Sequence, residues 1–392
     1  MKRVLLAWEA GAGRGHVVTL ARVARALRGV AACDAALGWM DHAQEIAPYC
    51  DCVFPGVRLG INREARTARN APPAATWAEY LLDCRFNETA RIRTNVAWWI
   101  EVIRLRQIAL VVADYAPNAL MAARICGVPG VAVGTGYGIP PGELARFPVF
   151  LPEYATREAD EAALVAAVNA AIVPLGGKPL ASLPQVYARD GEMVRTLPLL
   201  DPYAAQRPAD CYLPPVADYA GIADGRGNEL FCYFSTREFE NPALVEALAT
   251  LGLPLACFLP NADAAVRERL RAAGAQISDH PLPVEEIAQR ARLVFNSGQH
   301  GIACLALAAG LPQVCLPQHL EQLYHARRLE QAGAARVIWP RTAPADQIRQ
   351  IVRDSWEDRA MANTAQHMAR DLAAVFAEDD LALMRAQLSR WL

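Results

Sequence analysis

The chain has 392 residues, a length that the usual domain size of about 100 to 200 residues divides into two domains. Hydrophobic residues make up 53% and charged residues 20%, and the mean hydropathy is +0.10, which excludes a disordered chain. The 39 basic and 41 acidic residues leave a net charge of −2, so nucleic acid is not an expected partner. No segment stays apolar over the roughly 18 residues that a membrane span requires.

The first apolar run and the cysteines both indicate a cytoplasmic protein. Residues 4–8 are too few for the apolar core of a secretory signal, which takes roughly 7 to 15 residues, and they predict a strand instead. Ten cysteines are scattered along the chain, and only Cys50 and Cys52 lie close together, at a spacing too tight for the usual zinc site. Reduced thiols are therefore expected.

Short apolar runs alternate with amphipathic stretches, which is the pattern of parallel strands covered by helices on both faces. In the first half, strands are predicted at 4–8, 108–113 and 130–133, with helices at 17–27 and near 118–125. Residues 76–106 predict long helical material. Its aromatic residues either pack in a core or line a ligand site.

The second half repeats this alternation after a segment rich in Pro, Gly, Asp and Tyr that predicts a linker. Strands are expected at 230–234, 253–258, 293–295, 313–316 and 336–338. The resulting division is a first domain over 1–205, a linker over 206–229, a second domain over 230–375 and a C-terminal helix over 376–392. That last helix either frays or packs back on the first domain.

A glycine-rich turn, EAGAGRGH at residues 9–16, follows the first strand. Backbone N–H groups at such a turn favour an anion or another polar ligand, but the glycine spacing departs from the dinucleotide pattern and lacks the Lys-Ser/Thr of a P-loop. His16, at the carboxyl end of a strand, suits a general base if a carboxylate holds its far nitrogen. Asp114 ends another strand and is the candidate. The alternatives are a packing histidine and a helix-capping aspartate.

A second turn of this kind, NSGQHG at residues 296–301, leads from a strand into a helix and predicts a phosphate site. The next strand ends in PQHLEQ at residues 317–322. Carboxylate and amide side chains there suit a polyhydroxylated ligand, although an acidic first turn of a helix also occurs without one. His319 and His325 are expected on a helix surface, and no metal site is predicted.

The stretch GIACLALAAGLPQVCLPQHLEQLYHA, residues 301–326, resembles the nucleotide-sugar-binding signature of GT-B glycosyltransferases. It is most similar to glycosyltransferase family 1, the UDP-glycosyltransferase-like enzymes, and to their bacterial relatives. With Gly15-His16 and Asp114 the resemblance extends over nearly the whole chain. It implies an α/β fold of two Rossmann-like, doubly wound domains that face each other across a cleft.

The resemblance also assigns roles to residues. It implies that His16 deprotonates the acceptor and that Asp114 orients it. The implied donor-binding residues are Ser235, Thr236, Pro281, Leu282, Ser297, Gly298, Gln299, His300, Gly301, Gln318, Glu321 and Gln322. The acceptor-binding candidates are Gly15, Trp77, Tyr80 and Tyr137. Family members commonly have His-Gly-Gly where this chain has Ser297-Gly298-Gln299.

The expected function is an inverting, metal-independent glycosyltransferase. Its co-substrate would be a UDP- or dTDP-linked sugar, its acceptor a small molecule, lipid or saccharide, and it would need no cofactor. Two alternatives remain open: a nucleotide-sugar hydrolase or epimerase of related fold, and an inactive protein that binds sugar nucleotides. The sequence also leaves open whether the protein is a monomer or a homodimer.

Overall fold

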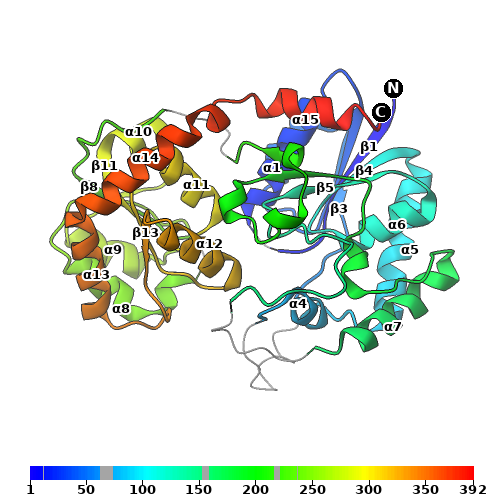
Figure 1. Ribbon diagram of the computed structural model, residues 1–392, viewed down its shortest axis with the longest axis horizontal. Coiled ribbons are helices and arrows are strands. Elements are labelled where there is room, and N and C mark those ends of the chain that lie inside the picture. The colour runs from blue at the N-terminus through cyan, green and yellow to red at the C-terminus, as the bar shows by residue number, and fades with distance from the viewer. Residues whose placement is uncertain (12, 62–73, 152–158, 216–220, 236) are drawn as a thin grey trace. The chain divides into compact units, whose positions relative to one another are not determined.

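The chain folds into two compact units, each built around one parallel sheet (Figure 1). The computed structural model describes residues 1–11, 13–61, 74–151, 159–215, 221–235 and 237–392. The first unit comprises Met1–Leu213 and Asp379–Leu392, and the second comprises Pro214–Glu378. Of the helices in these ranges, none combines the length and the apolar character of a membrane span.

The described part of the first unit contains a seven-stranded sheet in the order β3-β2-β1-β4-β5-β6-β7. Every neighbouring pair is parallel. The strands are β1 (Arg3–Trp8), β2 (Ala32–Leu37), β3 (Cys52–Pro55), β4 (Ile108–Asp114), β5 (Gly130–Gly134), β6 (Gly191–Arg195) and β7 (Tyr212–Leu213). The central strands β1 and β4 read as continuous apolar runs because both of their faces are covered.

Helices cover both faces of this sheet. They are α1 (Arg14–Ala26), α2 (Ala43–Ile46), α4 (Trp77–Asp83), α5 (Thr89–Leu105), α6 (Pro117–Cys126), α7 (Glu161–Ile172) and α15 (Asp380–Leu388). In Figure 1, α5 lies beside α6 and α7. On the other face, α1 packs against α2 and α15. Because β1 and β4 are followed by crossovers in opposite directions, right-handed connections place α1 and α6 on opposite faces.

The C-terminal helix α15 belongs to the first unit. Asp379 caps it by accepting hydrogen bonds from the N–H groups of Leu381 (3.0 Å) and Ala382 (3.1 Å). Asp380 then forms a buried ion pair with Arg22 of α1. A buried charge is retained only where a partner compensates its lost hydration, so this pair fixes where the chain returns to the first unit.

The second unit contains a six-stranded parallel sheet among its described residues, in the order β10-β9-β8-β11-β12-β13. The strands are β8 (Glu229–Tyr233), β9 (Leu255–Phe258), β10 (Gln276–Ser278), β11 (Ala291–Asn296), β12 (Gln313–Cys315) and β13 (Ala335–Val337). The helices are α8 (Pro242–Ala249), α9 (Ala264–Ala272), α10 (Val284–Arg290), α11 (His300–Ala308), α12 (Leu320–Gln331), α13 (Ala345–Glu357) and α14 (Arg359–Phe376).

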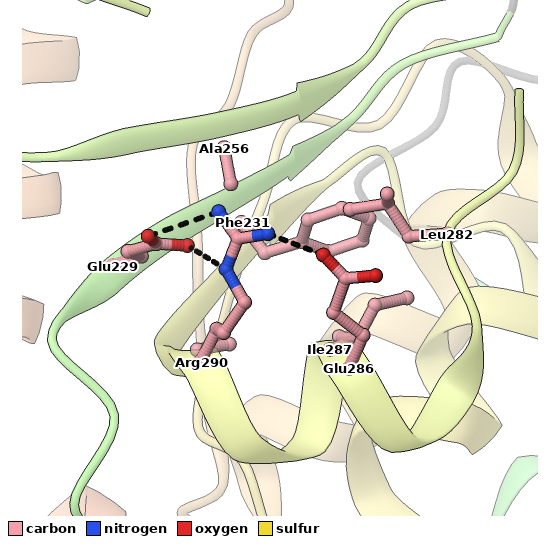
Figure 2. A pocket seen from close by; sticks show the side chains of 8 residues that line it. Glu229, Phe231, Ala256, Leu282, Glu286, Ile287 and Arg290 are labelled. Atoms are coloured by element: carbon pink, nitrogen blue, oxygen red, sulfur yellow. Dashed lines mark hydrogen bonds and ion pairs between the residues drawn. The ribbon is translucent and has the colours of Figure 1, made fainter. Parts of the chain in front are cut away.

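Arg290, the last residue of α10, ties this helix to the sheet of the second unit. Its guanidinium donates to both carboxylate oxygens of Glu229, at 2.9 and 3.0 Å, and also pairs with Glu286 one turn earlier (Figure 2). Phe231 and Leu282 line a small pocket beside this ion pair. Because Glu229 is the first residue of β8, the ion pair lies at the amino ends of the strands, away from the loops that follow their carboxyl ends.

The predicted class, with two doubly wound parallel sheets, is confirmed, while several boundaries differ from the prediction. The first unit continues to Leu213, beyond residue 205, because Tyr212–Leu213 adds a seventh strand beside β6. The second unit begins at Pro214 rather than at 230, and ends at Glu378. The helical material predicted over 76–106 forms two helices, α4 and α5, with a turn at 84–88 between them.

Candidate active site

Each sheet reverses its strand order between two central strands, and the candidate residues follow these strands. In the first unit the reversal lies between β1 and β4, where Trp8 pairs in register with Asp114. In the second it lies between β8 and β11, where Tyr233 pairs with Asn296. Ligands of open α/β sheets bind outside the carboxyl ends of the strands at such reversals. The topology therefore places one candidate site in each unit.

His16 and Asp114 meet at the reversal in the first unit. His16 lies in the first turn of α1, and Asp114 is the last residue of β4. His16 Nδ1 is 3.1 Å from Asp114 Oδ2, with the imidazole 17% and the carboxylate 3% exposed. When Nδ1 carries the proton and donates it to this carboxylate, Nε2 is the basic nitrogen. This is the arrangement that general-base catalysis requires.

The helix-capping alternative for Asp114 does not describe its contacts, because a different carboxylate caps α6. Glu9 accepts hydrogen bonds from the N–H groups of Asn118 (3.2 Å) and Ala119 (2.8 Å) in the first turn of that helix. Burial raises the pKa of Glu9 to about 8, and these hydrogen bonds oppose the rise. Glu9 therefore joins the loop after β1 to the helix that follows β4.

Aromatic rings enclose the imidazole of His16. Trp8 stacks on it with ring centroids 5.0 Å apart and an interplanar angle of 22°. Tyr115 meets it edge-on at 5.1 Å. A Cβ atom on Gly11 would lie 2.6 Å from His16 Nε2, so this nitrogen lies directly against the bare Cα of the turn.

The predicted acceptor residues belong to one aromatic cluster that begins at the imidazole. The ring of Tyr115 lies 5.4 Å from that of Trp77, which contacts Tyr80 at 5.1 Å and Tyr137 at 5.6 Å. Trp77 is only 2% exposed, and its Nε1 donates to the carbonyl of Tyr137 (3.1 Å). Trp77 is therefore a core residue, whereas Tyr137 is half-buried. Gly15 lies in α1, and its missing side chain faces open space.

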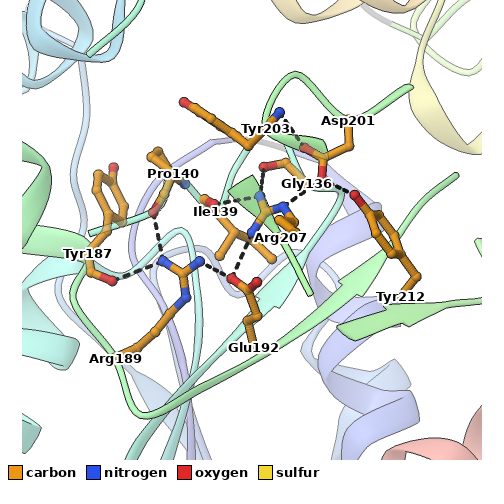
Figure 3. A network of polar contacts seen from close by, with 10 residues as sticks. All are labelled: Gly136, Ile139, Pro140, Tyr187, Arg189, Glu192, Asp201, Tyr203, Arg207 and Tyr212. Atoms are coloured by element: carbon orange, nitrogen blue, oxygen red, sulfur yellow. Dashed lines mark hydrogen bonds and ion pairs between the residues drawn. The ribbon is translucent and has the colours of Figure 1, made fainter. Parts of the chain in front are cut away.

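A buried network of charges holds the loop that carries Tyr137. Arg207 donates to the carbonyls of Gly136 (2.8 Å) and Ile139 (2.7 Å), and pairs with Asp201 and Glu192 (Figure 3). Arg207 thus compensates both carboxylates and satisfies two loop carbonyls with one side chain. On the other side of this loop, a Cβ atom on Gly138 would overlap the ring of Tyr115.

In the second unit, the turn after β11 brings three of the predicted donor residues together. Gln299 Nε2 donates to Ser235 Oγ (3.2 Å), and Ser297 N donates to Gln299 Oε1 (3.2 Å). Ser297 Oγ donates to Glu238, and Gln299 Nε2 also lies 3.4 Å from this carboxylate. Ser297 and Glu238 are both buried. The serine therefore lies in a buried position against a carboxylate.

The glycine of this turn lies against the start of α12. A Cβ atom on Gly298 would be 2.6 Å from the carbonyl oxygen of Gln322. Gln322 is buried, and its Oε1 accepts from the N–H of Gln318 (2.8 Å). His325 Nδ1 lies 3.4 Å from the Gly298 carbonyl, and its ring meets that of His300 at 5.4 Å. The two loops and two helices thus form one compact site.

The remaining predicted donor residues lie outside the set of contacts just described. Glu321 is half-exposed in the first turn of α12, and Gly301 is exposed in the first turn of α11. Pro281 is exposed, and Leu282 packs on the hydrophobic cluster beneath α10. Thr236 lies outside the described residues. In the parts of the chain that are described, no group of three or more His, Cys, Asp or Glu side chains could hold a metal ion.

The placement of His325 on a helix surface is wrong. His325 is fully buried, and burial lowers its pKa to about 4, so its imidazole stays neutral. The signal was present in the sequence: Gln322, His325, Ala326 and Leu329 follow a helical spacing and are all buried. The spacing of His325 along the helix, and not the polarity of its side chain, indicates its buried position.

Three further residues of the two sites were missed. Trp8 and Tyr115 flank His16, and Glu238 lies beneath Ser297. Trp8 ends its strand and Tyr115 follows directly after Asp114, so an aromatic residue at each of the two strand ends was the available signal. Nothing in the local sequence pattern marks Glu238.

Comparisons with known proteins agree with this architecture. Residues 261–382 match the family described as erythromycin biosynthesis protein CIII-like, C-terminal domain. The ecdysteroid UDP-glucosyltransferase of Autographa californica nuclear polyhedrosis virus is 45% identical over 49 residues, which are 12% of this chain and only 10% of the viral enzyme.

Solved structures match over the full length. CalG4, the calicheamicin glycosyltransferase, has a TM-score of 0.71 and 17% identity, with 100% of this chain and 98% of that chain covered. The glycosyltransferase VinC in complex with dTDP has a TM-score of 0.66 and 18% identity, with 99% of both chains covered. The spinosyn rhamnosyltransferase SpnG with spinosyn aglycone has a TM-score of 0.64 and 14% identity, over 97% and 99%.

The chain has the GT-B fold. The resemblance to GT-B glycosyltransferases that the sequence motifs indicate is thereby confirmed. In the second GT-B unit, the matched family segment includes α11, α12 and the turn between β11 and α11. These are the elements that form its candidate site.

Proposed function

We propose that this protein is an inverting glycosyltransferase that needs no metal and uses a nucleoside-diphosphate sugar. The observation that carries the proposal is the contact of His16 Nδ1 with Asp114 Oδ2, 3.1 Å long, at the strand-order reversal of the first unit. An imidazole held by a buried carboxylate is suited to removing a proton from a hydroxyl. The base therefore belongs to the unit that binds the acceptor.

The proposed donor site is the turn between β11 and α11. Backbone N–H groups at the start of α11 favour the diphosphate, as helix N-termini favour anions generally. Ser235 and Gln299 already contact each other across this turn, and Gln322 begins the adjacent helix. VinC was crystallised with dTDP, which supports a dTDP- or UDP-linked donor here.

We propose an aromatic or otherwise apolar hydroxyl compound as the acceptor. The aromatic cluster leads from His16 through Tyr115 to the half-buried Tyr137, and aromatic side chains provide large apolar contact surfaces. The aglycone complex of SpnG supports this class of acceptor.

The proposed reaction is a single displacement. His16 Nε2 takes the proton of the acceptor hydroxyl as its oxygen forms a bond to the anomeric carbon, and the bond from that carbon to the diphosphate oxygen breaks. The nucleoside diphosphate leaves with the electron pair, and the imidazolium later gives its proton to solvent. Amides at the start of α11 would stabilise the developing charge without a metal.

His16→Ala tests the base assignment. It should lower the transfer rate by about 10² to 10⁴-fold, which is the usual contribution of a general base, while dTDP and UDP still bind with wild-type affinity in calorimetry. Transfer is measured by mass spectrometry over a panel of flat phenolic and apolar alcohols, with and without EDTA. Normal turnover by the variant would refute the assignment.

The same assay separates the alternatives. Release of nucleoside diphosphate from donor and water alone, at the rate seen with an acceptor, identifies a hydrolase. Nucleotide binding without turnover on any acceptor identifies a binding protein. Loss of transfer in EDTA that returns with a divalent cation contradicts the proposed independence from metals.

A further inference from the structure

We infer that Trp8 is a positioning residue of the base site: its indole face fixes the plane of the His16 imidazole and stabilises the imidazolium formed during transfer. This inference rests on the proposed function because it takes His16 to be the base. Trp8, the last residue of β1, would thus hold the imidazole in place, which neither the glycine turn nor the contact with Asp114 does by itself.

The indole is held firmly against the imidazole. Trp8 is 2% exposed, and its Nε1 donates to the carbonyl of Ala10 (2.6 Å) within the same turn. Trp39 supports its other side with ring centroids 4.9 Å apart. The stack on His16 is nearly parallel, at 22°, and close, at 5.0 Å. Trp8 therefore restricts rotation of the imidazole about its bond to Cβ.

Different groups lie next to the other sides of the imidazole. Asp114 takes Nδ1, the phenol ring of Tyr115 meets an edge, and Gly11 lies beside Nε2. The hydroxyl of Tyr80 accepts from the N–H of Gly11 at 3.3 Å, and burial raises its pKa well above the ordinary value, so this phenol stays neutral. Asp114 alone of these groups carries a charge.

An arginine and a second titratable carboxyl lie near, and neither makes a described contact with the imidazole. The Arg58 guanidinium lies over the far ring of the stack, 4.6 Å from Trp39. The Glu9 carboxyl is turned to the start of α6. Neither group makes a described contact with the indole of Trp8, and both are present in every variant compared.

A π face close to an imidazole favours its charged form. A cation within about 6 Å of a tryptophan ring is attracted by the negative potential of its face. Proton transfer converts His16 from neutral to cationic, so the attraction grows as the reaction proceeds. Trp8 should therefore raise the basicity of His16, in addition to the effect of Asp114, and lower the barrier to proton removal.

Two substitutions isolate the aromatic face. Trp8→Phe and Trp8→Leu both lose the hydrogen bond to Ala10, but only Phe retains a π face. The pKa of His16 should fall in the order wild type, Phe, Leu. The acidic limb of the kcat profile should move to lower pH in the same order, by about half a pH unit for Leu. kcat on the alkaline plateau should fall several-fold, with little change in the KM for the donor.

The measurement does not depend on finding an acceptor. The seven histidines are labelled with ¹³C at the ring, His16→Ala identifies the His16 signal, and its titration is followed by NMR. Trp99→Phe is the matched control: Trp99 is fully buried in the same unit and meets Trp98 edge-on. It should lower thermal stability without moving the His16 titration.

The outcomes are distinct. A His16 titration equal in wild type, Trp8→Phe and Trp8→Leu overturns the inference, whether or not transfer is detected. So does a shift of the same size in Phe and Leu, which would trace the effect to the lost Ala10 hydrogen bond. If Trp8→Leu does not fold, Trp8→Met, which also lacks a π face, takes its place in the same comparison. Absence of transfer in wild type counts against the proposed function alone.

Discussion

The two candidate sites share a topology but differ in chemistry. Each follows two central parallel strands at a reversal of strand order, and each uses a glycine-containing turn that leads into a helix. In the first unit the turn presents His16, a titratable ring with a carboxylate partner and aromatic walls. In the second it presents a serine, an amide and backbone groups, with His325 beneath it held neutral.

This difference matches the separate tasks of the proposed reaction. A base has to gain a proton during transfer, so its surroundings must accept both charge states. A site for a diphosphate has to present donors that do not change, because its ligand is charged throughout. In the proposed reaction, the loop after β1 therefore serves proton transfer in the first unit, and the loop after β11 serves anion binding in the second. Substitutions at the two turns should separate these functions.

Gly11→Ala should have the largest effect on turnover. Gly11 has φ +81°, and the added Cβ atom would lie 2.6 Å from His16 Nε2, so the imidazole has to leave its place beside Asp114. We expect the transfer rate to fall by about 10²-fold or more, with unchanged affinity for dTDP. Steady-state rates and calorimetry on the same preparation measure both quantities.

Gly13→Ala is the control for backbone strain. Gly13 lies two residues further on with φ +113°, and a Cβ atom there would meet nothing within 4 Å. It should cost stability, about 1 kcal/mol or more, but leave most of the turnover. Equal loss of turnover in both variants would show that the strain of the turn, and not the displacement of His16, causes the loss.

Gly298→Ala should act on the donor instead of the base. Its φ is +79°, and the Cβ atom would lie 2.6 Å from the Gln322 carbonyl, so the turn and the start of α12 have to separate. The affinity for dTDP and UDP should fall by roughly tenfold, equivalent to about 1.4 kcal/mol. The His16 titration should stay as in wild type.

Gly274→Ala provides the comparison in the second unit, since Gly274 has φ +92° with open space around it. Its nucleotide affinity should equal that of wild type. A Gly298→Ala variant that binds dTDP normally would remove the turn from the donor site.

The sequence predicts the central strands of both sheets and the residues that end them. Continuous apolar runs identify β1, β4, β8 and β11, and the polar residues after them identify His16, Asp114 and the second turn. The edge strand β7, only two residues long, lies inside the predicted linker because so short a strand carries no periodicity.

Side-chain partners from distant segments could not be predicted in the same way. Glu9 caps α6 from 109 residues away, and Glu238 accepts from Ser297 across 59 residues. Such contacts depend on which loops the folded sheet brings together. The stack of Trp8 on His16 depends further on the backbone path through the turn, which residue types alone do not specify.

The two units should show opposite pH dependences of stability. The pKa of Glu9 is raised from 4.5 to about 8, so its contribution is present below pH 4.5 and is lost as pH rises through about 8. The pKa of His325 is lowered from 6.5 to about 4, so its contribution to stability is present above pH 6.5 and is lost as pH falls through about 4.

The test compares free energies of unfolding. The free energy of wild type minus that of Glu9→Gln should decline with rising pH, and the free energy of wild type minus that of His325→Leu should decline with falling pH. Each decline should be on the order of a few kcal/mol. Calorimetric unfolding of the three proteins between pH 4 and 9 measures both differences. A difference that is flat with pH for either variant would show that this residue titrates alike in the folded and unfolded chain.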